Sequence, residues 1–68
     1  MVRLELGEVY YDNKKKGHIT YVGREIRETT YYRFLIGLDH PGFGQSKSGD
    51  VAIVHEDYLR NIKMIPGY

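Results

Sequence analysis

The sequence predicts an all-β fold of five short strands, and three features of the chain support this prediction. Apolar and polar residues alternate with a period of two over much of the chain, which is the pattern of half-buried strands. Glycine, which favours turns, occurs eight times in 68 residues. Tyrosine, which favours strands, occurs seven times. This length is enough for one core, so we expect residues 1–68 to form a single domain.

The first two predicted strands lie on either side of a lysine-rich turn. Apolar residues alternate with charged ones over residues 2–6, and strand-favouring residues continue over 8–11, beyond Gly7. Residues 12–17 are expected to form a turn or loop, because Asp, Asn and Gly favour turn geometry and lysines prefer water. Residues 18–22 are mostly β-branched or aromatic and predict the next strand.

That second strand is expected to bend at Gly23, where a glycine favours a bulge. Residues 24–28 are highly charged, and we expect a strand end and loop there, since five uncapped residues are too few for a stable helix. Residues 29–39 form the longest predicted strand. Its core face is predicted to carry Tyr32, Phe34, Ile36 and Leu38. Its opposite face carries Tyr31, Arg33, Leu35, Gly37 and Asp39.

Residues 40–49 form the one long irregular segment, with three glycines and one proline in ten residues. Long loops in small domains tend to be functional or mobile. A further strand is predicted over 50–54. Residues 55–60 are expected to form a single helical turn, because an acidic pair favours its N-terminal end. A last short strand is predicted over 61–65.

Five strands with one helical turn before the last must close on themselves to cover both edges of the sheet. This order resembles that of the SH3-like small barrels, which include Tudor and KOW domains. The resemblance is carried by the opening strand at 6–9, by the glycine and alternating apolar residues at 17–22, and by the strand, helical turn and strand at 54–62. It implies a five-stranded SH3-like barrel, a fold that many unrelated functions share.

The chain is also similar in architecture to the plasmid-type dihydrofolate reductases, SH3-like barrels that form a tetramer around a central pore. The similarity rests on the His-Pro-Gly turn at 40–42 and on the strand at 51–54. In that family a Gln and a Tyr of this strand line the pore, whereas Ala52 and Val54 stand at these positions here. The resemblance therefore implies a shared architecture without the reductase activity.

Residues suited to catalysis are few. The chain has no cysteine, and its two serines lie in the glycine-rich segment 40–49, where loop flexibility works against the placement that catalysis needs. This segment is also no P-loop, since Ser46 rather than glycine precedes Lys47 and a strand is predicted to follow. No two histidines have the spacing of metal ligands on one element. We therefore expect no enzyme, no catalytic residue, no metal site and no cofactor.

Charge and composition narrow the range of partners. Ten Lys and Arg residues face nine Asp and Glu residues, whereas a domain that binds mainly the phosphate backbone usually carries a clear basic excess. No apolar run is long enough to span a membrane. The absence of cysteine fits a reducing compartment, so we expect a cytoplasmic protein without a membrane partner.

The first functional hypothesis is that the protein is a non-enzymatic binding module. We expect a small accessory or regulatory protein, of the kind found in bacteria or phages, that recognises a protein partner or pairs with itself. Tyr and Arg are enriched where binding energy is concentrated, and the predicted site combines the outward face of the longest strand with the 40–49 loop. The residues expected to contact the partner are Tyr31, Arg33, Leu35, His40, Phe43, Gln45 and Lys47.

Two alternatives remain open. One is a KOW- or Tudor-like barrel that binds nucleic acid, because lysines and arginines are interleaved with tyrosines that can stack on bases. Its contact residues would be Lys14, Lys15, Lys16, Arg24 and Arg27. Glu25 and Glu28 weaken the local positive field of this set. The other alternative is a homo-oligomer that binds a small ligand at its subunit interfaces.

Overall fold

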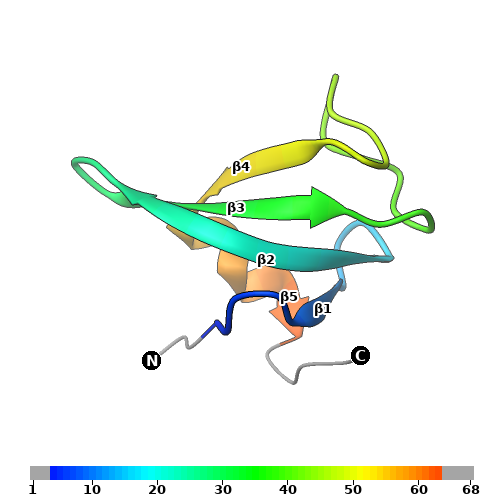
Figure 1. The fold of residues 1–68 in the computed structure, drawn as a ribbon, viewed down its shortest axis with the longest axis horizontal. Coiled ribbons are helices and arrows are strands. Elements are labelled where there is room, and N and C mark those ends of the chain that lie inside the picture. The colour runs from blue at the N-terminus through cyan, green and yellow to red at the C-terminus, as the bar shows by residue number, and fades with distance from the viewer. Residues whose placement is uncertain (1–3, 64–68) are drawn as a thin grey trace.

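The computed structural model describes residues 4–63 and shows an all-β domain (Figure 1). Its elements are β1 (Val9–Asp12), β2 (Gly17–Ile26), β3 (Thr30–Ile36), β4 (Val51–His55), the 3₁₀ helix η1 (Glu56–Asn61) and β5 (Ile62–Lys63). The strands form one antiparallel sheet in the order β4-β3-β2-β1-β5. The predicted all-β class is confirmed: five antiparallel strands form one sheet, with a single short 3₁₀ helix before the last strand.

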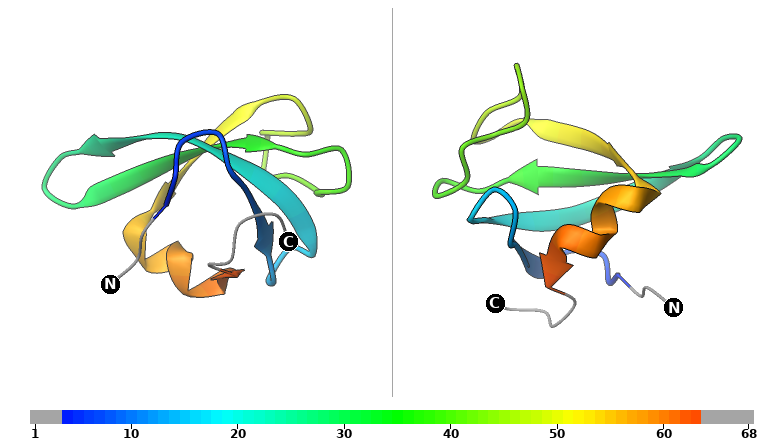
Figure 2. Two further views of the ribbon diagram at one scale, coloured as in Figure 1. Left: turned by 60° about the horizontal axis from the view of Figure 1, so that its bottom comes forward. Right: turned by 180° about the vertical axis from the view of Figure 1, so that it is seen from behind.

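The core lies between the concave face of the curled sheet and η1, which crosses beneath it (Figure 2). The sheet contributes alternate residues of its long strands, and η1 contributes Leu59. The buried apolar residues are Tyr10, Ile19, Tyr21, Phe34, Ile36, Ala52, Val54, Leu59 and Ile62. The strand register explains this set, because Tyr10, Ile19 and Ile36 lie directly opposite one another across three strands.

The bulge predicted at Gly23 is present. The register of β2 against β3 shifts between Tyr21 and Gly23, and Gly23 has a φ of 143°. Such a conformation is open to glycine and costly for other residues. β2 then continues as far as Ile26, so the charged segment after Gly23 begins as strand, and the loop is confined to residues 27–29.

Two predictions about where strands begin and end are wrong. The opening strand, expected to include residue 6, begins only at Val9, because the chain turns at Gly7 (φ 83°), and Leu6 is 72% exposed. Leu38 is 97% exposed and does not belong to the core. β3 ends at Ile36, after which the Gly37 N–H donates to the His18 carbonyl at 3.0 Å.

The residue that follows β3 must be glycine. A Cβ atom on residue 37 would lie 2.6 Å from the His18 carbonyl oxygen, so only glycine permits this approach. The chain then turns, with the His40 N–H donating to the Gly37 carbonyl. The helical turn and the last strand agree with their predictions over the described range, while residues 2–3 and 64–65 of the predicted outer strands lie outside it.

Candidate protein-binding face

The convex face of the sheet carries exposed apolar side chains in register. Val51, Leu35, Thr20 and Val9 lie directly opposite one another across β4, β3, β2 and β1. Because directly opposed residues of antiparallel strands point to the same side of the sheet, these four side chains form one row. Three of the four are apolar and exposed.

A second row lies beside the first. Ile53 is opposite Arg33, which is opposite Gly23, and Val22 is the extra residue of the bulge next to them. The apolar residues of the two rows are between 38% and 51% exposed, and we call them the outer patch: Val9, Val22, Leu35, Val51 and Ile53. Exposed apolar side chains gathered on one face are typical of interaction sites in soluble proteins.

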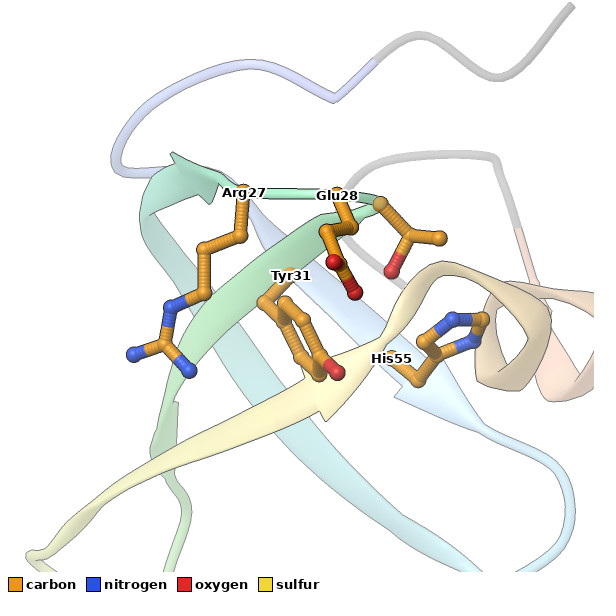
Figure 3. Close-up of a pocket in the computed structure, with 5 residues that line it drawn as sticks. Arg27, Glu28, Tyr31 and His55 are labelled. Carbon is orange, nitrogen blue, oxygen red and sulfur yellow. The ribbon is translucent and has the colours of Figure 1, made fainter.

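A pocket of about 470 Å³ lies at one end of this face, and we call it the end pocket (Figure 3). It is lined by Arg27, Glu28, Thr29, Tyr31 and His55. The Tyr31 and His55 rings meet nearly at right angles, with centroids 5.3 Å apart. The Arg27 guanidinium lies 5.2 Å from the centre of the Tyr31 ring. The pocket therefore offers an aromatic wall with charged groups at its rim.

Glu25 binds the guanidinium groups of both Arg27 and Arg33. Its carboxylate accepts a hydrogen bond from Arg33 Nη2 at 2.7 Å and another from Arg27. These hydrogen bonds, that from Arg33 first, lower the pKa of Glu25 below its ordinary value. Glu25 therefore stays ionised and holds both guanidinium groups beside the outer patch and the end pocket.

His55 is fixed by the start of η1. Its Nδ1 accepts the Asp57 N–H at 3.1 Å, so the neutral ring carries its proton on Nε2. This contact caps the first turn of η1 and places the imidazole at the junction between β4 and the helix. The ring is therefore oriented before any partner arrives.

The 40–49 segment is more ordered than its composition predicts. Phe43 and Ser46 exchange backbone hydrogen bonds of 2.8 and 2.9 Å, which fold the segment into a tight hairpin. His40 is buried: its Nδ1 accepts the Gly42 N–H at 2.9 Å, and its Nε2 therefore donates to Asp12 Oδ2 at 2.9 Å. His40 thus acts within the fold and is not part of the surface.

Asp12 is the centre of a buried polar cluster. Its Oδ1 accepts the backbone N–H groups of Lys14 and Lys15, at 3.0 and 3.1 Å. Its Oδ2 accepts from His40 and from the Tyr58 hydroxyl, which lies at 2.6 Å. Burial, and next the hydrogen bond and charge of Asp12, raise the pKa of Tyr58 above its ordinary value. This one carboxylate holds together the β1–β2 turn, the 40–49 segment and η1.

The cluster gathers a second group of side chains at the surface, which we call the basic–aromatic end: Lys14, Lys15, Phe43 and Tyr58. The Phe43 ring packs edge-on against Tyr58, with centroids 5.3 Å apart. Lys14 Nζ lies 5.8 Å from the centre of the Tyr58 ring, and Lys15 Nζ lies 5.8 Å from that of Phe43. At such distances the negative face of an aromatic ring attracts the lysine ammonium group.

The predicted partner-binding residues fall into two groups. Tyr31, Arg33 and Leu35 share the convex face, as expected. The 40–49 segment, with Phe43 and the exposed Gln45 and Lys47, follows the opposite end of β3 from Tyr31 (Figure 1). The structure therefore does not bring Tyr31 and this segment into one site.

The predicted nucleic-acid residues also divide. Lys14, Lys15 and Lys16 lie in the turn that precedes β2, whereas Arg24 and Arg27 lie at or beyond its far end. Glu25 binds Arg27 there, as described above. The two groups are separated by most of the length of the ten-residue strand β2.

The sequence does not predict several residues of both sites. It predicts a strand for Val51 and Ile53 but no face for either, because residues 51–54 are all apolar and show no alternation. It predicts a turn at Asp12 and a helical turn at Tyr58, and no local signal relates the two residues. Within residues 4–63, no three His, Asp or Glu side chains are grouped to hold a metal ion. Over the same range the structure contains no helix of the length and apolarity that a membrane crossing requires.

The chain was compared with known proteins at the levels of family, sequence and structure. No family model, no curated protein and no solved structure matches it.

Proposed function

We propose that this protein is a non-enzymatic binding module that recognises a protein partner through the convex face of its sheet. The observation that supports the proposal is the outer patch, in which exposed apolar side chains from four strands lie on one face of the sheet. Removing apolar surface from water contributes about 25 cal/mol per Å² to association. A rigid sheet also loses little freedom on binding, which lowers the cost of association.

The surroundings of the outer patch suit a protein partner. Arg33 lies within the patch and Tyr31 lies at its end, and these two residue types are enriched at interface hot spots. The end pocket is large enough to receive a side chain of the partner. By this proposal the protein is a small accessory or regulatory factor that acts by occupying a surface of its partner.

Two leucines provide a matched test. Leu35 lies in the outer patch, whereas Leu38 is exposed on the turn after β3. Immobilised wild-type protein should capture a partner from the native extract in a manner insensitive to nuclease. The Leu35→Glu variant should lose this capture, because a charge would be buried against the partner, and Leu38→Glu should retain it. Equal capture by both variants would contradict the proposal.

The basic–aromatic end favours a second candidate function, nucleic-acid binding. Lys14 and Lys15 lie over the rings of Tyr58 and Phe43, which combines phosphate-binding charge with surfaces for base stacking. Binding of single-stranded RNA should then weaken with salt, with a slope of about −0.7 per phosphate contact. Lys15→Glu should reduce the affinity, while Arg24→Glu, at the far end of β2, should have a smaller effect. A salt-independent affinity would exclude this function.

A further inference from the structure

The outer edge of β4 is open. β4 is the last strand of the sheet on its side, and no described element lies beyond it (Figure 1). The Asp50 carbonyl accepts the Ile36 N–H of β3 at 2.9 Å. Because successive residues of an antiparallel strand direct their backbone groups to opposite edges, those of Val51, Ile53 and His55 point away from β3. The N–H and C=O groups of Val51 and Ile53 therefore line the open edge, together with the N–H of His55, whose carbonyl accepts the first hydrogen bond of η1 as its N-cap.

This edge lacks the features that usually prevent pairing. Natural edge strands carry lysine, proline or bulges, or are very short. Residues 51–54 are Val-Ala-Ile-Val, with no charge and no proline, and β4 pairs with β3 without a register shift. The opposite edge of the same sheet is formed by β5, which has two residues, one of them an exposed lysine. The two edges differ, and within residues 4–63 only that of β4 is suited to accept another strand.

We propose that β4 pairs antiparallel with β4 of a second copy of this chain, about a two-fold axis at Ile53. In this register Ile53 lies opposite Ile53 of the second copy, and Val51 lies opposite its His55. The two Ile53 residues can exchange two N–H···O=C hydrogen bonds, and in each Val51–His55 pair the His55 N–H can donate to the Val51 carbonyl. β4 is thus complementary to itself, as a two-fold interface requires.

The side chains fit the same register. On the convex face, Ile53 of each copy would meet at the axis, so the two outer patches would become one continuous apolar surface. On the concave face, Ala52 would lie beside Val54 of the second copy, and both residues are uncharged. Asp50 and Glu56 lie just beyond the ends of β4. Like charges would therefore meet outside the paired residues and confine the pairing to β4.

The size of the chain favours a second copy as the occupant. A domain of about 60 residues buries only about 60% of the surface that its unfolded chain exposes. Small domains gain stability from disulfides, metals or oligomerisation, and this chain has no cysteine. Self-pairing requires no partner other than a second copy of this chain. The inference does not depend on the proposed function, since the convex face remains open in the dimer.

The mass in solution tests the pairing. Light scattering behind gel filtration, over the micromolar range, should give twice the 8.0 kDa of the chain. Ile53→Pro removes an N–H that points to the open edge and not to β3, so it should yield a folded monomer. Ile53→Lys should do the same by placing like charges at the axis. Val22→Lys is the matched control, since Val22 has similar exposure but lies on β2, and it should remain dimeric.

Amide exchange locates the interface directly. The Ile53 amide should exchange slowly in concentrated protein and faster on dilution, because only the dimer gives it an acceptor. Circular dichroism checks that each variant is folded, and Ile53→Lys decides the outcome if Ile53→Pro is unfolded.

Several results would overturn the inference. A wild-type monomer throughout the micromolar range would do so, and so would a dimer that survives both Ile53 variants. Loss of the dimer in Val22→Lys would place the interface on the convex face and not on the edge of β4. The proposed function has a different readout: capture of a partner depends on Leu35, whatever the mass of the protein.

Discussion

The Asp12 carboxylate is buried and accepts hydrogen bonds from four donors, which belong to three separate parts of the chain. A buried donor that loses its acceptor costs about 1–3 kcal/mol. The Gly42 N–H occupies Nδ1 of His40, so the ring proton lies on Nε2 and is donated to Asp12. Single side chains of this cluster therefore influence the turn, the 40–49 segment and the helix together.

Removing the Asp12 carboxylate should destabilise the whole domain. We expect Asp12→Ala to lower the free energy of unfolding by about 3 kcal/mol, since it leaves His40 Nε2–H and the Tyr58 hydroxyl without acceptors. Urea denaturation followed by circular dichroism measures this change. Asn13→Ala, at an exposed neighbour in the same turn, is the control and should change it by less than about 0.5 kcal/mol. Equal effects of the two substitutions would contradict the role assigned to Asp12.

Tyr58 should make stability depend on pH in alkaline solution. Its pKa is raised in the folded state above the ordinary value near 10. Its contribution to stability is therefore complete below about pH 10 and declines as the pH rises toward the folded value. Wild type should exceed Tyr58→Phe in unfolding free energy by about 1–2 kcal/mol at neutral pH. This difference should narrow above pH 10, and a constant difference would contradict it.

At the scale of secondary structure, β3 is shorter than its alternation predicts. Phe34 belongs to the core, but Leu38 continues the same pattern of apolar residues and is exposed. After Ile36 the Gly37 N–H still donates to the His18 carbonyl of β2, and the chain then turns so that the His40 N–H donates to the Gly37 carbonyl. β2 also departs from its prediction, since it continues past the bulge at Gly23 into a charged segment.

A pair of substitutions measures the difference between the buried Phe34 and the exposed Leu38. Phe34→Ala should lower the free energy of unfolding by about 3–5 kcal/mol, because it leaves a cavity in the core. Leu38→Ala should change it by less than about 0.5 kcal/mol, as expected of an exposed side chain. Thermal and urea denaturation measure both. A large loss of stability in Leu38→Ala would show that this residue packs against the domain after all.

At the scale of the whole molecule, the two candidate surfaces are separate. The outer patch covers the convex side of the sheet, while the basic–aromatic end lies where the β1–β2 turn meets the 40–49 segment and η1. The edge of β4 borders the outer patch through Val51 and Ile53. Pairing at that edge would therefore enlarge the convex binding face without covering it.

Dimerisation should also be visible in the stability of the molecule. A partner that binds only the folded state raises the apparent stability by mass action. The melting temperature of the wild type should therefore rise with protein concentration, whereas that of Ile53→Lys should stay constant. Scanning calorimetry at several concentrations measures this. A melting temperature independent of concentration in the wild type would speak against the dimer.

The sequence alone determined the class of the fold, because alternation, glycines and the acidic pair in the first turn of the helix are local signals. It also placed Tyr31, Arg33 and Leu35 on one face, since a strand has a period of two. Tertiary structure decided where strands end and which exposed residues adjoin, because these depend on contacts between distant segments. Asp12 and Tyr58 meet across 46 residues, and Val51 joins Val9 only through the register of four strands.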